Sequence, residues 1–396
     1  MKICLINNIY PPYHRGGAEQ VVVKTVEGLV AAGHDVVVIT STPDSAGVTR
    51  ESGATIYRIR VPNIFFYTNA HEHGFLTRFL WHVIDIANLS CSHTIRTILN
   101  TERPDIVHTH NLMGLSFLIP RTIQNMKIRH IHTVHDVQLV EPSGIIYKEK
   151  ETSWRYTGFP TKIYTWLMKH LMGSPQVVIS PSQFLKNFYS SRGFFPSSHL
   201  AIVRNPMTFH PAASHAREAH STVRFLYIGQ LEKHKGVETL IEAFRAIPTS
   251  SAELHIVGGG AALESIRTAA NDMYDMHVHG RVEREDLPRL FSRMDMTVVP
   301  SLCYENSPTV IFESLAFGLP VIASNIEGVA ELIQEGENGL TFPAGDAAAL
   351  ASVMLWCVAH TDAVVAMQQK TNQSLIGLSR DEYIGRLEEF YQNNYK

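Results

Sequence analysis

Short apolar runs alternate with helix-length amphipathic stretches along almost the whole chain, and this alternation limits the fold more than any other feature. It is typical of βα units, in which helices connect the strands of a parallel sheet. The expected strands form two series, separated by a segment at 206–222 that is rich in Ala, His, Ser and Thr. A chain of 396 residues also exceeds what one hydrophobic core usually serves. The sequence therefore predicts an α/β protein of two doubly wound domains.

The expected strands of the first series are Lys2–Ile6, Val36–Thr40, Thr55–Val61, Asp105–Thr109, His130–Val134, Gln176–Ser180 and Leu200–Val203. Those of the second series are Arg224–Ile228, Glu253–Val257, His277–His279, Met296–Pro300 and Val321–Ser324. Beyond Gly345 the pattern is helical. In the last segment, 381–395, one helical face is apolar and is predicted to be buried; it carries Tyr383, Ile384, Leu387, Phe390 and Tyr391.

Two carboxylates eight positions apart, Glu305 and Glu313, flank an expected loop-to-helix junction. Pro308 suits the first helical position, and Gly318 suits the end of the helix. Free amides at a helix start can bind a phosphate, and a carboxylate can accept two hydrogen bonds from vicinal hydroxyls. The junction therefore favours an anionic sugar ligand. The spacing alone is also explained by two solvated residues without a ligand, a surface Glu in the loop and a Glu on an exposed helix face.

This motif, followed by Gly318-Leu-Pro-Val-Ile, resembles the E-x7-E signature of the family 4 retaining glycosyltransferases of GT-B fold. The string Pro-Pro-x-x-x-Gly-Gly-Ala-Glu that ends at Glu19 resembles the loop of that family that faces the donor diphosphate. The resemblance extends over nearly the whole chain. It implies two Rossmann-like domains facing an interdomain cleft: an acceptor domain over 1–205 and a nucleotide-sugar donor domain over 206–377. A terminal helix, 378–396, would pack back on the first domain.

The resemblance also implies roles for individual residues. His135, at the end of an expected strand, would contact the donor sugar, and Asp136 would order its loop. Glu305 would hold sugar hydroxyls, Glu313 the ribose and Lys235 the diphosphate, so that His135, Lys235 and Glu305 form the catalytic set. The implied donor-binding residues are Gly16, Gly17, Gly229, Gln230, Lys235, Asn306, Ser307, Pro308, Thr309 and Glu313. A plain turn at the two adjacent glycines and an ordinary polar His at a strand end are alternative interpretations of the same residues.

One position departs from the family pattern. The family usually has Arg directly after the first Gly of the turn at Gly229, whereas this chain has Gln230. The substitution removes a full charge from the expected diphosphate clamp. There are two alternatives. Another basic residue supplies the missing positive charge, for which Lys233, Arg204 and Arg15 are the candidates, or the turnover is weaker than is usual in the family.

A metal role for the histidines has little support in the sequence. His is a common zinc ligand, and alternate strand residues share a face. The pattern His-x-His recurs four times among 21 histidines, however, and so carries little information; the pairs are His71/His73, His108/His110, His130/His132 and His277/His279. The chain also lacks an Asp-x-Asp pair, the metal-holding signature of the other main glycosyltransferase fold. No cofactor and no metal are therefore expected beyond a UDP- or GDP-linked sugar co-substrate.

Composition excludes some partners and compartments. A net charge of −3 and a pI near 6.7 argue against general nucleic-acid binding. The four cysteines form no Cys-x-x-Cys pair, and the chain shows neither a secretory leader pattern nor an apolar run of about 20 residues. A cytoplasmic protein is expected. Aromatic and basic residues at 160–172, together with apolar residues at 65–67 and 75–83, suit either ordinary core helices or contact with the inner face of the plasma membrane.

Together with the resemblance, which alone implies retention, these observations predict a retaining, metal-independent hexosyltransferase. It would move a sugar from a nucleotide diphosphate to a hydroxyl of a glycan or lipid-linked acceptor, as in cell-surface polysaccharide synthesis. Two alternatives remain: a non-hydrolysing sugar-nucleotide epimerase, and a non-catalytic sugar-nucleotide-binding protein, for which Gln230 is the motive. A dehydrogenase is disfavoured because no strand is followed by Gly-x-Gly-x-x-Gly. Base, sugar and linkage do not follow from these motifs.

Overall fold

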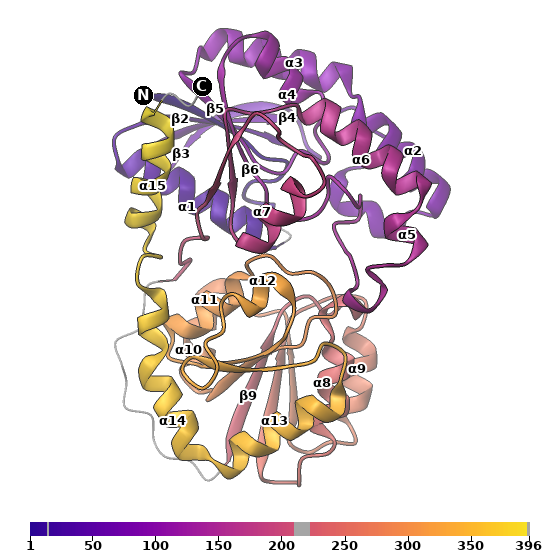
Figure 1. Ribbon diagram of the computed structural model, residues 1–396, viewed down its shortest axis with the longest axis vertical. Helices are drawn as coiled ribbons and strands as arrows, with labels where there is room; N and C mark the ends of the chain where they lie inside the picture. The colour runs from indigo at the N-terminus through magenta and orange to yellow at the C-terminus, as the bar shows by residue number, and fades with distance from the viewer. Residues whose placement is uncertain (14–15, 210–221, 394–396) are drawn as a thin grey trace. The chain divides into compact units, whose positions relative to one another are not determined.

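The computed structural model describes residues 1–13, 16–209 and 222–393, which form two compact units (Figure 1). Unit 1 comprises Met1–Gly144, Gly158–Pro206 and Arg380–Lys396. Unit 2 comprises Ile145–Thr157 and Met207–Ser379. Each unit contains one sheet with helices on both faces.

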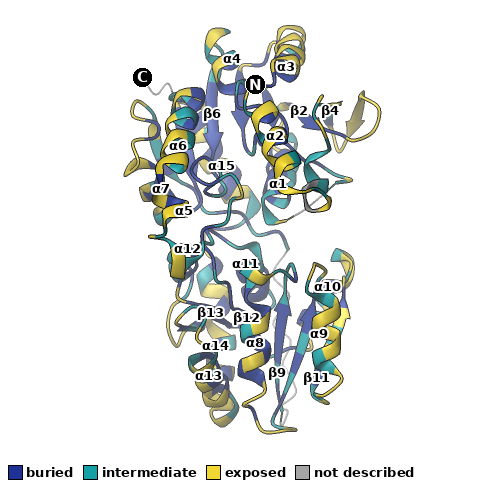
Figure 2. Cartoon of the chain, turned by 90° about the vertical axis from the view of Figure 1, so that its right-hand side faces the viewer, coloured by how far each residue is buried: buried dark blue, intermediate teal, exposed yellow. Residues whose placement is uncertain are grey.

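The sheet of unit 1 has the strand order β3-β4-β2-β1-β5-β6-β7-β8, and its neighbouring strands are parallel except for the antiparallel pair β3 and β4. Its strands are β1 (Lys2–Ile6), β2 (Asp35–Ser41), β3 (Gly47–Glu51), β4 (Ala54–Ile59), β5 (Ile106–Thr109), β6 (Arg129–Thr133), β7 (Val177–Ser180) and β8 (His199–Ile202). The central strands are buried on both faces, which explains why they are continuous Val- and Ile-rich runs. Figure 2 shows these strands in dark blue.

The helices of unit 1 follow the strands in βα order. They are α1 (Gly17–Ala31), η1 (Tyr67–Glu72), α2 (Phe75–Ile86), α3 (Leu89–Glu102), α4 (Ile119–Asn125), α6 (Phe159–Met172), α7 (Gln183–Ser190) and α15 (Arg380–Gln392). The side chains of Asn88 and Ser182 cap α3 and α7 by accepting hydrogen bonds from backbone amides three residues later.

The sheet of unit 2 is parallel throughout, in the order β11-β10-β9-β12-β13-β14. Its strands are β9 (Val223–Ile228), β10 (Ala252–Val257), β11 (Met276–Gly280), β12 (Met296–Val299), β13 (Val321–Ser324) and β14 (Gly339–Phe342). Its helices are η2 (Lys148–Lys150), α5 (Trp154–Thr157), η3 (Lys233–Lys235), α8 (Val237–Phe244), α9 (Leu263–Ala270), η4 (Arg284–Asp286), α10 (Leu287–Phe291), α11 (Thr309–Ala316), α12 (Glu327–Ala330), α13 (Ala347–Ala359), α14 (Thr361–Lys370) and η5 (Thr371–Leu375).

Two strands and one helix start differ from the expectations. β3, with the sequence Gly-Val-Thr-Arg-Glu, is exposed at every residue, so it lacks the apolar alternation that marks a half-buried strand. β14 lies at the sheet edge and is not among the expected strands. Pro308 is the residue that caps α11, and the first helical residue is Thr309. Its extended backbone keeps Pro308 just outside the helix.

The segment 145–157 packs with unit 2, although the sequence expectation placed it in the first domain. Tyr147 forms an antiparallel bridge with Cys303. Around this bridge the Lys148 amide donates to the Leu302 carbonyl (3.0 Å), and the Tyr304 amide donates to the Ile146 carbonyl (2.9 Å). These backbone hydrogen bonds, rather than an apolar face, fix the segment, which explains why the hydrophobic pattern gave no sign of it.

The terminal helix α15 packs on α1 within unit 1. The five residues predicted for its buried face, Tyr383, Ile384, Leu387, Phe390 and Tyr391, are all buried, which confirms that prediction. Arg129 of β6 donates to the Phe390 carbonyl (2.7 Å), so the last helical turn is also held by a charged donor. The helix ends at Gln392 in the structure.

No single helix in the described ranges 1–13, 16–209 and 222–393 is long and apolar enough to cross a bilayer.

The packing of α15 on α1 depends on Gly28. A Cβ at this position would lie 2.4 Å from Cγ1 of Ile384, which is closer than real Cβ atoms approach. We expect Gly28→Leu to force the two helices apart and to lower the free energy of unfolding by about 2 kcal/mol, a typical cost of overpacking. The measurement is urea unfolding, with hydrogen exchange of the α15 amides as the local readout.

Gly385→Leu is the matched control. Gly385 lies in α15, is exposed, and its Cβ would have no described atom within 4 Å. Because Leu favours a helix over Gly by up to about 1 kcal/mol, this change should preserve or raise stability. Equal destabilisation by both changes would show that the Gly28 contact is unimportant.

Candidate functional site

A close approach of two loops builds the central part of the site in unit 2. Gly236 links η3 to α8 in the left-handed region, with φ of 71°, and a Cβ there would lie 1.8 Å from the Pro300 carbonyl oxygen. The Leu302 amide donates to the His234 carbonyl (2.9 Å) at the same contact. The turn after β9 and the loop after β12 are therefore locked together at the carboxyl ends of their strands, where open α/β sheets bind ligands.

This contact brings together two of the three residues assigned to the catalytic set. The Lys235 ammonium lies 2.5 Å from Oε1 of Glu305, and the Ser301 hydroxyl donates to the same oxygen (2.9 Å). The side chains are 27% and 13% exposed, so the ion pair is only partly screened by water. Burial of Lys235 opposes its charge, but the Glu305 carboxylate more than offsets this effect, and the pKa of Lys235 is raised.

The segment 145–157 supports the Glu305 loop from the side. The Tyr304 hydroxyl donates to the Glu151 carboxylate, and Lys148 contacts both Glu151 and Glu327. Glu327 begins α12, whose Gly328 would place a Cβ 2.3 Å from the Glu305 carbonyl oxygen. The backbone of Glu305 thus lies between two fixed elements, which orients its side chain toward Lys235.

Glu313 takes part in a second, separate set of contacts. It lies on α11, is 5% exposed, and its Oε1 accepts hydrogen bonds from the Thr208 hydroxyl (2.7 Å) and from the Arg284 guanidinium (3.1 Å). Arg284 also lies over the ring of Phe209, 4.1 Å from its centroid. Both contacts use one carboxylate oxygen, and the Arg284 guanidinium balances the buried charge. No spacing in the sequence linked Arg284 or Thr208 to Glu313, because only the fold brings these segments together.

The other donor-binding residues assigned from the sequence lie at the turns of unit 2 and at the start of α1. Tyr227 donates its hydroxyl to the Gln230 carbonyl (2.7 Å), and the Gly229 amide donates to the Val257 carbonyl (3.1 Å). Asn306 and Ser307 are buried, and Pro308 and Thr309 open α11. In unit 1 Gly17 begins α1, and the Gly16 amide donates to the Glu19 carboxylate (2.8 Å).

The backbone of Gly16 is extended, a conformation that any residue adopts, so glycine is not required there for its φ. Of the residues considered as substitutes for the missing arginine, Arg15 lies outside the described residues. Lys233 lies in η3, two residues before Lys235.

In unit 1 His135 belongs to a cluster of five imidazoles on β5, β6 and the residues that follow these strands. Its members are His108, His110, His130, His132 and His135. Nδ1 of His110 lies 2.9 Å from Nε2 of His135. A small pocket is lined by both of these rings and by His132, Asp136 and Tyr189. Asp136 accepts from the Gln138 amide (2.8 Å), and its carbonyl accepts from the Tyr189 hydroxyl (2.6 Å), contacts that fix the loop after β6.

Burial determines the protonation of this cluster. It lowers the pKa of His108 and His130 to about 3 and that of His135 to about 4, and it holds the pKa of His110 and His132 well below 6.5. It raises the pKa of Asp136 to about 6 and that of Asp85 to about 8. All five imidazoles are therefore neutral at pH 7, so each can accept a hydrogen bond.

Comparison with known proteins gives two family matches. Residues 15–208 match the model described as "Glycosyltransferase Family 4", and residues 222–360 match "Glycosyl transferases group 1". Together the two matches span most of the chain. The chain belongs to the glycosyltransferases. Its two parallel sheets with their helices are the two Rossmann-like domains of a GT-B enzyme, as the motifs predicted.

Individual relatives of this glycosyltransferase agree with the family. An uncharacterised 42.6 kDa protein of the cps region of Klebsiella pneumoniae is 26% identical over 84% of this chain and 87% of its own. The lipopolysaccharide 1,2-N-acetylglucosaminetransferase of Salmonella typhimurium is 28% identical in a match that covers 62% of this chain and 61% of that protein. The glycosyltransferase is thus related to enzymes of cell-surface polysaccharide synthesis.

Solved structures show the same fold. Sucrose-phosphate synthase from Thermosynechococcus elongatus gives a TM-score of 0.76 at 20% identity, covering 99% of this chain and 98% of its own. HepE of Anabaena in complex with UDP-glucose gives a TM-score of 0.71 at 14% identity, and the match covers 98% of this chain and 99% of HepE.

The neutral histidine cluster predicts how the stability of the glycosyltransferase depends on pH. Because the unfolded imidazoles bind protons below about pH 6.5 and the buried ones do not, stability is lost as pH falls from there toward the folded values near 3 to 4. Asp85 and Asp136 have the opposite effect, since their raised pKa makes folding bind protons, but two carboxyls oppose five imidazoles. Net acid destabilisation is expected.

His130→Asn tests this expectation. The slope of unfolding free energy against pH between 6 and 4 should fall by about one proton, or about 1.4 kcal/mol per pH unit. His93→Asn, on the exposed surface of α3, should leave the slope unchanged. Urea titrations at several pH values give the slope, and an unchanged slope in His130→Asn would contradict the neutral assignment.

Proposed function

We propose that this glycosyltransferase is a retaining, metal-independent hexosyltransferase that uses a UDP- or GDP-linked sugar and a hydroxyl of a glycan or lipid-linked acceptor. In the reaction the bond between the anomeric carbon and the diphosphate oxygen breaks. A bond from the acceptor oxygen forms on the same face, and the acceptor proton passes to the departing phosphate oxygen. No cofactor is required in this scheme.

The contact between Lys235 and Glu305 carries this proposal. It supplies one cation at the carboxyl ends of β9 and β12, beside the first turn of α8, where helix amides add partial positive charge. A diphosphate bound there would replace Glu305 as the partner of Lys235. Glu305 would then be available to accept hydrogen bonds from sugar hydroxyls, so the donor diphosphate would meet an ammonium that is already in place.

Glu313 suits the ribose in this scheme. Its Oε1 is engaged by Thr208 and Arg284, so these contacts fix the carboxylate without using Oε2. The amides near Ser307 to Thr309 would add donors to the phosphates. His135 would contact the donor sugar as a neutral imidazole. The complex of the similarly folded HepE with UDP-glucose supports a nucleotide-sugar ligand.

A screen of nucleotide sugars by thermal shift tests donor binding. A ligand at about a hundredfold excess over its dissociation constant should add about 2.7 kcal/mol of stability. Glu313→Gln should abolish the shift because it loses the charge that holds Arg284 and the strongest acceptor for the ribose. Glu264→Gln is the control, since its side chain on α9 is 81% exposed. An undiminished shift in Glu313→Gln would show that the ribose lies elsewhere.

Incubation of the bound donor with lipid-linked glycan acceptors in EDTA separates the remaining alternatives. Product with the donor's anomeric configuration supports retaining, metal-independent transfer. Activity lost in EDTA and restored by magnesium would overturn metal independence, and conversion of donor without acceptor would indicate an epimerase. Binding with neither transfer nor hydrolysis would favour a non-catalytic protein, the alternative that Gln230 suggests.

We further propose that the protein is cytoplasmic and contacts the inner face of the plasma membrane through α2, where a lipid-linked acceptor resides. Trp81 and Asp85 of α2 are buried, whereas one face of the helix is apolar and more than half exposed; it carries Phe75, Leu76, Phe79, Leu80 and Val83. Arg78, also exposed, adds positive charge beside this face.

Replacing two residues of this face tests the membrane contact. Leu76→Glu/Phe79→Glu should lower co-sedimentation with phosphatidylglycerol vesicles at least about tenfold, because it removes apolar burial and adds like charge. Val365→Glu, at an apolar position on α14 that is 48% exposed, is the control. Equal vesicle binding by the double variant and the native protein would overturn the contact.

A further inference from the structure

Three histidines and one glutamate share one face at the edge of the unit 2 sheet. Glu253 and His255 alternate along β10, and His277 and His279 alternate along the edge strand β11. The parallel register places His255 directly opposite His277. The intervening residues point the other way, into the core, so the four polar side chains lie together on the outer face; these core residues are Leu254, Ile256 and Met276.

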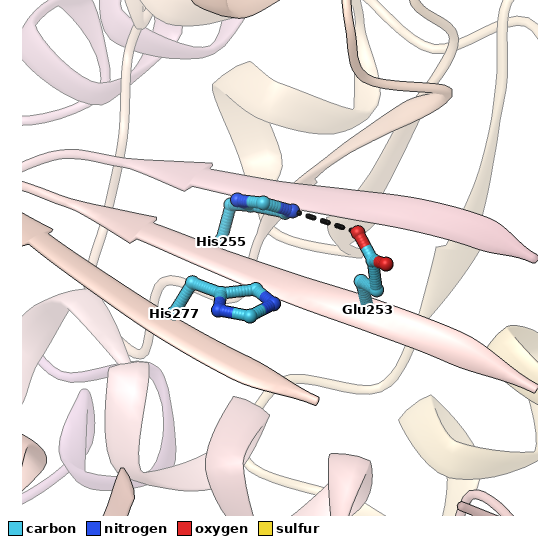
Figure 3. Close-up of side chains that lie close together, drawn as sticks. All are labelled: Glu253, His255 and His277. Carbon is cyan, nitrogen blue, oxygen red and sulfur yellow. Dashed lines mark hydrogen bonds and ion pairs between the residues drawn. The ribbon is translucent and has the colours of Figure 1, made fainter. Parts of the chain in front are cut away.

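The side chains are already close to one another. Nε2 of His255 lies 3.2 Å from the Glu253 carboxylate, and its Nδ1 lies 3.0 Å from Nε2 of His279. The rings of His255 and His277 have centroids 4.8 Å apart. Figure 3 shows Glu253, His255 and His277 on the same side of the two strands.

We propose that Glu253, His255 and His277 form a binding site for a divalent transition-metal ion that clamps β11 to β10. One ligand atom from each residue lies within 4.8 Å of the others. Tetrahedral zinc with bonds of about 2.0–2.1 Å requires about 3.4 Å between ligand atoms. His277 is exposed and can close this difference by a side-chain rotation. Among the described residues, no other group of three such side chains meets the same distance.

The chemistry of the ligands selects the class of metal. Two imidazoles and one carboxylate suit Zn²⁺, Ni²⁺ or Cu²⁺, whereas Mg²⁺ and Ca²⁺ prefer oxygen ligands alone. His279 contacts Nδ1 of His255 and thereby orients the ring, the usual role of a partner behind a metal-bound histidine.

The cation that the strand register places opposite Glu253 is already paired. Arg224 of β9 lies opposite Glu253 in the register, but its guanidinium is paired with Asp295 (3.3 Å). Asp275, which directly precedes β11, accepts a hydrogen bond from the Ser250 amide. Glu253 therefore supplies the anionic ligand that a divalent ion requires.

The site differs from the proposed donor site in place and in role. Lys235 and Glu305 follow the carboxyl ends of β9 and β12, whereas Glu253 and His277 are each the second residue of their strand. An ion there would tie the edge strand β11 to its neighbour β10. The inference does not rest on the proposed reaction, which uses no metal.

Isothermal titration of the chelator-treated full-length protein with ZnCl₂ tests the site. We expect one zinc ion per chain, and His277→Asn should weaken binding at least about 100-fold, because even partners behind the ligands are worth about 10- to 100-fold. Glu253→Gln should give a comparable loss. His93→Asn, an exposed histidine on α3, should leave the affinity unchanged.

Two further measurements locate the ion. Cobalt substitution should give the intense visible bands of a tetrahedral site, absent in His277→Asn, and zinc should slow hydrogen exchange of the β11 amides. His277 is exposed, so its replacement should not unfold the chain. Zinc affinity that is equal in native protein, His277→Asn and Glu253→Gln would overturn the inference, and so would the absence of binding.

Discussion

The close contact between Gly236 and the Pro300 carbonyl is the constraint on which the proposed donor site depends. Only a residue without a Cβ can bring the turn after β9 this near to the loop after β12. The consequence is electrostatic, because the same contact places the Lys235 ammonium against Glu305 in a partly buried position. A charge held in such surroundings interacts more strongly with an anion than an exposed lysine does, and its position needs little reorganisation when the anion changes.

The Glu305 loop is then supported by a segment that leaves unit 1 and returns to it. Tyr147 pairs with Cys303, and Lys148 joins Glu151 to Glu327, so the loop lies within a small network of strand pairing and ion pairs. Individual exposed ion pairs contribute little to stability, but a network with shared partners fixes geometry. The segment 145–157 therefore serves to orient Glu305 in the fold, although it belongs in sequence to the first half of the chain.

The sequence predicted the features that arise from local pattern and missed those that arise from long-range contact. Val- and Ile-rich runs identified most strands, and helical spacing identified the buried face of α15, because burial leaves a periodic record in the sequence. Exposed β3 left no such record. Arg284 and the segment 145–157 could not be assigned, since their partners are far away in sequence and the contacts are polar. The motifs indicated Lys235 and Glu305 separately, whereas the ion pair between them appears only in the fold.

The surroundings of the histidines decide whether the same sequence pattern serves a structural role or binds a ligand. His-x-His occurs at the end of β5 and on β6 inside unit 1, and on β11 at the edge of unit 2. Inside, burial keeps the rings neutral, and hydroxyls such as those of Thr109 and Thr133 occupy their nitrogens. At the edge, the rings have an acidic neighbour and access to solvent, the conditions under which imidazoles exchange hydrogen bonds for a metal ion. The spacing alone carries little information, and the burial and the neighbouring charge decide between a structural and a ligand-binding role.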